Sequence, residues 1–195
     1  MSLAAQTNSE TLSDQTTTLV LTDFSDASKA KFYEFFRNHT IIIPPEDLDL
    51  FDTSGVFLIA WVNYDIETKN GRIFIKDPQL FINQAVFQLD GKDNTGLICI
   101  TQEHEIAEAW SDISQYGLRS RRHKDRSARD FGHNQALLAE FRLAHELEVA
   151  RTYLDLIARW TLRQDDPQEA EIFWLENEQA FKITAGDNGE EFFSD

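Results

Sequence analysis

Residues 104–108, with the sequence His-Glu-Ile-Ala-Glu, combine residue types and a spacing that could hold a metal ion. His104 and Glu108 are four residues apart, so on a helix their side chains lie on one face, one turn apart, and can reach a single ion. Glu105 lies between them and could accept a proton from a water molecule at that ion. Two ligands and a general base in this order predict a hydrolytic metal site.

A third ligand has to come from another segment of the chain, and two histidines are candidates. We expect His133, because the connection that precedes it can fold it back over the helix that carries His104. Glu140 lies two helical turns beyond His133, roughly 10 Å, which is too far for both to bind one ion. Glu140 is therefore expected to contact one of the metal ligands and fix its orientation, without binding the ion itself. His145 is the alternative third ligand.

The pattern resembles the signature of the zincin metallopeptidases, which is His-Glu-x-x-His on a helix. The resemblance extends over roughly residues 70–140 and implies a peptide or protein substrate, with Glu105 as the base. Residues 71–75, Gly-Arg-Ile-Phe-Ile, are expected to form an edge strand like the one on which zincins align an extended peptide. Glu108 stands where the family has histidine, and a His/Glu pair also suits manganese or iron. The expected cofactor is thus a divalent transition metal, with zinc as the first choice.

Composition predicts one globular domain. The 195 residues are 42% hydrophobic, and we expect the domain to span residues 18–185, between a disordered tail at 1–17 and an acidic tail at 186–195. No apolar run is long enough to cross a membrane. Cys99 is the single cysteine, so no internal disulfide can form, and a reducing, cytoplasmic location is expected.

The formal net charge of −16 argues against direct binding to nucleic acid or to an anionic membrane, because both are polyanions. The charge is uneven: residues 119–129 are rich in Arg and Lys, whereas residues 164–195 contain Lys182 as their only base. The basic stretch is either a solvated loop or a patch for phosphate or an acidic partner. The acidity supports a second hypothesis, a non-enzymatic binding protein that engages a basic partner or mimics nucleic acid.

The first half of the chain has mostly β-type patterns. The expected elements are a strand at 18–24, a helix at 25–37 capped by Ser25, a strand at 41–43, a central strand at 56–63, and a hairpin turn at Asn70-Gly71 followed by a strand at 72–76. Residues 78–89 are ambiguous. Asp77-Pro78 favours a helix start there, and the alternative is a strand at 85–89 paired with 97–100.

The second half has helical patterns. We expect a helix at 101–115 capped by Thr101, a long helix at 134–162, and a final helix that Asp166 and Pro167 begin and that ends near residue 181. Together these elements predict an α+β fold, in which a small sheet in the N-terminal half packs against C-terminal helices that include one long helix.

Overall fold

The computed structural model describes residues 18–45, 59–88, 91–116 and 126–186. Several predicted features lie outside these residues. They are the tail at 1–17, nearly all of the acidic tail, the part of the basic stretch before residue 126, and the beginning of the strand expected at 56–63.

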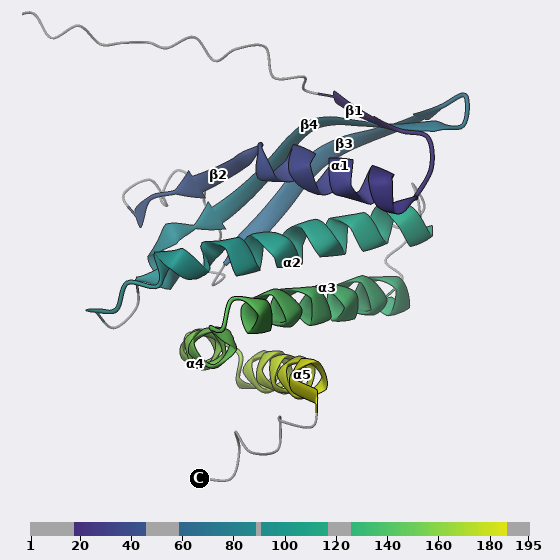
Figure 1. The fold of residues 1–195 in the computed structure, drawn as a ribbon. Helices are drawn as coiled ribbons and strands as arrows, with labels where there is room; N and C mark the ends of the chain where they lie inside the picture. The colour runs from purple at the N-terminus through teal and green to yellow at the C-terminus, as the bar shows by residue number, and fades with distance from the viewer. Residues whose placement is uncertain (1–17, 46–58, 89–90, 117–125, 187–195) are drawn as a thin grey trace, which may run out of the picture.

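The chain forms an α+β fold, as predicted from its sequence. Its main elements are β1 (Thr18–Leu21), α1 (Asp26–Arg37), β2 (Thr40–Ile43), β3 (Ala60–Lys69), β4 (Arg72–Asn83), α2 (Ile98–Ser111), α3 (Arg126–Glu146), α4 (Ala150–Thr161) and α5 (Pro167–Ala185). Figure 1 shows the sheet covered by α1 and α2, with α3 packed beneath α2 and with α4 and α5 beyond α3. Among the described residues, no helix is both long and apolar enough to cross a membrane.

Strand β4 is the centre of the sheet. It pairs with β3 along one side, and on its other side it pairs first with β1, antiparallel, and then with β2, parallel. Two sequence predictions are therefore wrong. In the described part of the chain, the strand predicted at 56–63 begins at Ala60 and lies beside the centre, and residues 73–75 of the expected edge strand have partners on both sides. The 12 residues of β4 are enough for two short strands to share one of its sides.

The helix predicted at residues 78–89 is also wrong, because β4 continues to Asn83 and a 3₁₀ turn follows at 84–87. Asp77 has a positive φ of 48°, and the register of β4 against β3 shifts by one residue at this point. Pro78, which has no N–H to donate, thus lies at a strand irregularity between the segments that pair with β1 and β2. The alternative strand at 97–100 is excluded as well, because Ile98 begins α2.

The long helix predicted at 134–162 is two helices, α3 and α4. Helix α3 ends in a Schellman motif, in which the Val149 N–H donates to the Ala144 carbonyl at 2.9 Å and the Glu148 N–H donates to the His145 carbonyl at 3.0 Å. Glu148 takes the left-handed conformation, with φ at 59°, that this motif requires. Glycine usually fills that position. Because glutamate fills it here, the sequence shows no glycine or proline that would mark the break.

The predicted caps are correct at two of three helices. Ser25 caps α1, and Asp166 caps α5, with Pro167 as its first residue. Helix α2 instead begins three residues before Thr101. Thr101 is buried within that helix, where its hydroxyl lies 3.1 Å from the Tyr153 hydroxyl.

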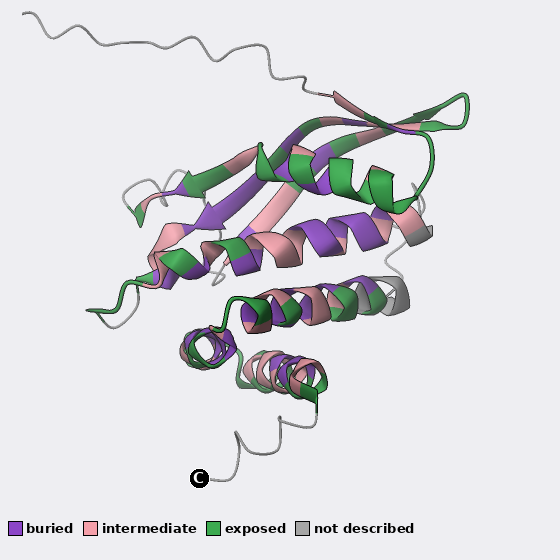
Figure 2. Ribbon diagram, viewed as in Figure 1, coloured by how far each residue is buried: buried purple, intermediate pink, exposed green. Residues whose placement is uncertain are grey.

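The core lies between the sheet and the helices, and Figure 2 shows the buried residues along β4 and along the packed faces of the helices. Phe32 and Phe36 of α1 are fully buried, as are Ile75 and Ile82 of β4. Helix α4 is tied to the end of the sheet by Trp160, whose indole N–H donates to the carbonyl of Val86 at 2.8 Å. This contact fixes the position of α4 relative to α2 and β4.

Candidate metal centre

A cavity of about 400 Å³ opens between α2, α3, α4 and α5, next to the beginning of β3. The side chains from α2 and α3 that line it are mostly histidines and carboxylates. On α4 and α5, Ile157, Trp160 and Phe173 contribute apolar surface, which we call the apolar section of the cavity. Tyr153, Glu176 and Asn177 of the same two helices also line the cavity.

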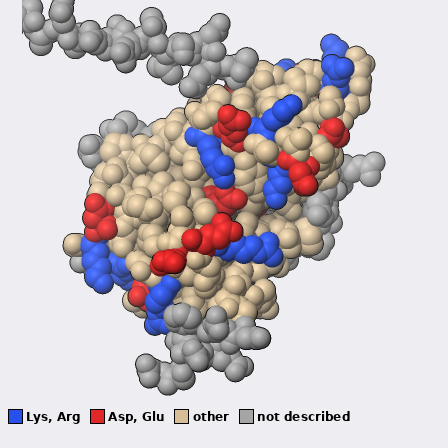
Figure 3. Space-filling model, in the orientation of Figure 1, with Lys and Arg blue, Asp and Glu red and all other residues tan. Residues whose placement is uncertain are grey.

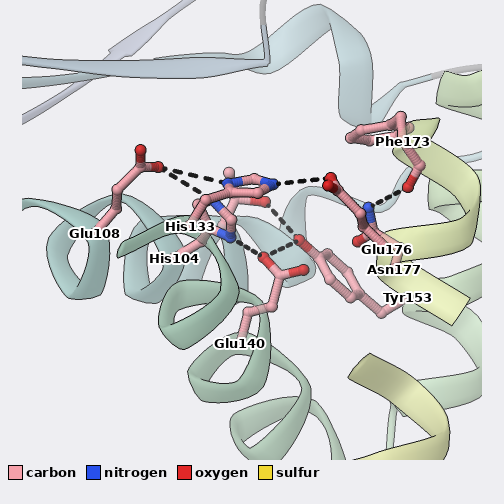
Figure 4. A network of polar contacts seen from close by, with 9 residues as sticks. His104, Glu108, His133, Glu140, Tyr153, Phe173, Glu176 and Asn177 are labelled. Carbon is pink, nitrogen blue, oxygen red and sulfur yellow. Dashed lines mark hydrogen bonds and ion pairs between the residues drawn. The ribbon is translucent and has the colours of Figure 1, made fainter. Parts of the chain in front are cut away.

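His104, Glu108 and His133 meet in the part of the cavity that α2 and α3 line, where one ligand atom from each lies within 4.8 Å of the others. The Glu108 Oε2 atom lies 3.5 Å from His104 Nε2 and 3.7 Å from His133 Nδ1 (Figure 4). Two ligands of a tetrahedral zinc ion are about 3.3 Å apart, since each bond is close to 2.0 Å. The structure thus brings the three predicted ligands together at distances that suit one ion.

The local sequence explains how the three side chains meet. His104 and Glu108 are one turn apart on α2, so they share a face. His133 lies on α3 directly after Gly132, which is buried against the end of α2. A Cβ atom on Gly132 would lie 3.0 Å from the Asp112 carboxylate, a tight contact that the Asp112 side chain would have to relieve by moving. Gly132 therefore packs closely against the end of α2, and His133 follows it at the side of α3 that faces Glu108.

Each of the two histidines contacts Glu108 through one ring nitrogen and a second carboxylate through the other. His104 Nδ1 lies 2.7 Å from the buried Glu140, as the sequence predicted for a supporting residue. His133 Nε2 lies 3.5 Å from Glu176 of α5. Carboxylates in this position fix the orientation of a metal-binding imidazole and raise its basicity. Glu176 was not expected from the sequence, because no spacing links it to the other site residues.

Tyr153 of α4 forms a hydrogen bond with Glu140. Its buried hydroxyl donates to Glu140 Oε2 at 3.4 Å and lies 3.1 Å from the Thr101 hydroxyl. Burial, together with the charge of Glu140, raises the pKa of Tyr153 well above its usual value, so Tyr153 keeps its proton as a donor. A continuous helix at 134–162 would have carried Tyr153 away from the site, so this role was missed.

The charges of His104 and Glu108 shift the pKa of each other. Burial disfavours the charged form of His104, but Glu140 and Glu108 outweigh this effect and raise the pKa of His104 well above its ordinary value. Burial would raise the pKa of Glu108, yet His104 and His133 hold it well below its usual range. These opposite shifts indicate that His104 and Glu108 form an ion pair in the metal-free protein.

Glu105 lines the same cavity as the three candidate ligands. Burial raises the pKa of Glu105 to about 7; His104 opposes this rise, and the negative charges of Glu108 and Glu140 add to it. A carboxyl group that exchanges its proton near neutral pH can act as a general base or a general acid. The residue predicted as the base is therefore positioned beside the predicted ligands.

His145, the alternative third ligand, is not part of the cluster. It lies three turns further along α3 than His133, and its ring packs against Phe181 with 5.3 Å between ring centroids. Of the two histidines considered, only His133 reaches Glu108.

The chain matches no protein-family model, no curated protein and no solved structure. The functional argument therefore depends on the geometry of the site.

Proposed function

We propose that the protein is a metal-dependent hydrolase whose zinc ion is held by His104, Glu108 and His133. The convergence of three ligand atoms within 4.8 Å carries this proposal. The two supporting carboxylates, Glu140 and Glu176, strengthen it, because each contacts the histidine nitrogen that faces away from Glu108. Three protein ligands leave a fourth position for water or substrate, as in catalytic zinc sites.

Glu105 is the residue that would activate water. It lines the cavity next to the ligands, and its carboxylate can take a proton from the attacking water and then pass it to the leaving group. This is the role that the zincin resemblance implies for it. The substrate, however, need not be an extended peptide. Residues 73–75 of β4 are paired with β1 on one side and β3 on the other, so they do not offer a free edge for a peptide strand.

Metal binding is the first test of this function. Chelator-treated protein should bind close to one equivalent of zinc in a calorimetric titration, and the His104→Ala variant should lose this binding. His145→Ala is the matched control, because His145 lies on α3 away from the cluster. If the wild-type protein binds no zinc and is not stabilised by zinc against heat, the proposed function is wrong.

The role of Glu105 requires a separate test with the zinc-loaded protein. Glu105→Gln should keep its zinc and lose hydrolysis of activated esters by about 100-fold or more, as expected for loss of a general base. Glu103→Gln is the control, because Glu103 lies on the same helix and pairs instead with Arg37 at 2.7 Å. Equal activity of the two variants would exclude Glu105 as the base.

The non-enzymatic acidic binding protein is the second candidate, and it depends on the net charge of −16. On the face drawn in Figure 3, acidic side chains are interspersed with Lys and Arg and do not form one continuous acidic field. A zinc-free protein that binds a basic partner in a salt-dependent manner would favour the binding protein.

We place the activity in the cytoplasm. Cys99 is an exposed thiol, and the chain has no second cysteine with which to form an internal disulfide. An exposed thiol persists in its reduced form most readily in a reducing compartment.

A further inference from the structure

We propose that the substrate is a small, uncharged amide or ester whose acyl group is aromatic or branched aliphatic. This inference rests on the proposed function, because the carbonyl that is cleaved has to lie beside the ion at His104, Glu108 and His133. The apolar section of the cavity then receives the acyl group.

The apolar section has a rigid aromatic wall. The indole of Trp160 is held by its hydrogen bond to the Val86 carbonyl at 2.8 Å and by edge contacts with Phe87 and Tyr153, at 5.4 and 6.0 Å between ring centroids. Phe173, half-buried on α5, lines the same section. Such a surface binds flat or branched apolar groups, because they gain burial without ordering the protein further.

The charges of the cavity oppose an anionic substrate. Four carboxylates line it, those of Glu105, Glu108, Glu140 and Glu176, and among its described lining residues none is Lys or Arg. A phosphate or carboxylate on the substrate would meet these groups without a basic side chain to pair with beyond the two histidines. An uncharged amide or ester avoids this repulsion.

The size of the cavity limits the length of the substrate. At about 400 Å³ it lies near the lower end of the range of small-molecule sites, about 300–1,000 Å³. A short acyl compound fits into this volume, whereas a peptide of many residues would extend beyond it.

The reaction is a hydrolysis in which no electron is gained or lost overall. The oxygen of water bonds to the acyl carbon as Glu105 accepts a proton from that water. The bond from the acyl carbon to the nitrogen or oxygen of the leaving group then breaks, its electron pair stays on that atom, and Glu105 returns the proton to it. The products are a carboxylic acid and an amine or an alcohol.

The test compares three hydroxamates, which bind zinc through the same group and differ only in the attached part. Phenylacetohydroxamate, acetohydroxamate and 4-carboxyphenylacetohydroxamate are titrated into the zinc-loaded protein by calorimetry. We expect the phenyl compound to bind about tenfold or more tightly than the methyl compound, since apolar pockets discriminate by this order. The carboxyphenyl compound should lose most of this advantage.

Phe173→Ala should reduce the preference for phenyl over methyl at least threefold and leave zinc affinity unchanged. Ile172→Ala is the matched control, because Ile172 is the exposed neighbour of Phe173 on α5. If circular dichroism shows that Phe173→Ala is not folded, Phe173→Leu replaces it and should also reduce the preference for phenyl over methyl, whereas Ile172→Ala should not.

The outcomes separate the two proposals. A protein that binds zinc but binds the phenyl and methyl compounds equally, or binds the carboxyphenyl compound best, overturns the inference and leaves the metal site intact. A preference that Phe173→Ala and Ile172→Ala reduce to the same extent also overturns it. A protein that binds no zinc overturns the proposed function and the inference with it.

Discussion

The two histidines of the candidate centre have different surroundings. On the inner side, the His104 side chain is 12% exposed and is supported by Glu140, of which 4% is exposed. On the outer side, the His133 side chain is 30% exposed and is supported by Glu176, of which 41% is exposed. The inner pair is held by further buried contacts, whereas the outer pair is open to water. We therefore expect the inner side to determine metal affinity and the outer side to adjust when substrate enters.

The largest expected effect comes from removing the ligands themselves. His104→Ala should weaken zinc binding by roughly 1,000-fold, because it removes a preoriented ligand. His133→Ala should weaken it less, since water can replace an exposed ligand more readily than a buried one. Competition with a chromogenic chelator measures both affinities. If His133→Ala has the larger effect, the assignment of inner and outer sides is reversed.

Removing the charge of the supporting carboxylates should also lower zinc affinity more on the inner side than on the outer side, with smaller losses than those from removing the ligands. Glu140→Gln should reduce zinc affinity by about 10- to 100-fold, the usual effect of a supporting residue. Glu176→Gln should reduce it by less than about threefold, because solvent screens an exposed charge pair. Equal losses in the two variants, measured in the same chelator assay, would show that burial does not distinguish the two sides.

Zinc affinity should depend on pH through His104. The pKa of this imidazole is raised in the metal-free protein, and its proton must leave before zinc binds. Below that raised pKa, affinity should fall by about tenfold for each pH unit. Calorimetric titrations from pH 6 to pH 9 in buffers of different ionisation enthalpy would count the protons released. Affinity that does not change over this range would contradict the ion-paired state.

The stability of the metal-free protein should change in the opposite direction. Because the pKa of His104 is higher in the folded protein, the ion pairs stabilise the fold fully below about pH 6.5, the ordinary pKa of histidine. This contribution is lost as the pH rises through the raised pKa. Urea unfolding in chelator should therefore show stability falling towards pH 9. His104→Gln should flatten this dependence, and His145→Gln should not.

The smallest effect is expected at Tyr153, which acts on the inner side through Glu140. Tyr153→Phe removes the hydroxyl that contacts Glu140 and Thr101, so stability should fall by about 1 kcal/mol and zinc affinity by about two- to threefold. Tyr33→Phe, at a buried tyrosine on α1 that is not among the residues lining the cavity, is the control. A Tyr33→Phe variant that weakens zinc binding as much would indicate a general loss of stability.

The sequence predicted those parts of the fold that depend on local signals. The α+β class and the caps at Ser25 and Asp166 follow from periodicity and from side chains adjacent to each helix. The break after α3 was missed because Glu148 occupies a left-handed position without glycine. The extension of β4 through Pro78 was missed because proline is rare within strands. It is tolerated there only where its missing N–H is not needed, and the sequence does not show which positions those are. Tertiary pairing, which the sequence does not display, decided both cases.

The candidate site was predictable to the extent that helical spacing determines it. His104 and Glu108 share a face on any helix, and His133 was chosen because the connection that precedes it can fold it back over the helix that carries His104. Glu176 joins the site from a distant part of the chain, on α5. Its position depends on the turn that ends α3 and changes the direction of the chain, so no sequence spacing could reveal it.

That turn, at Leu147–Val149, has a consequence for how the protein can diversify. The three candidate ligands lie before it, on α2 and α3, whereas Trp160 and Phe173 of the apolar section lie after it. The ligands and the aromatic lining therefore come from consecutive stretches of the chain, but the later stretch also supplies Glu176 and Tyr153, which contact His133 and Glu140. Under the proposed function, a substitution at Phe173 would change which acyl group is accepted while the ligands and their supporting residues stay as they are, which makes Phe173 the first position to vary for a new specificity.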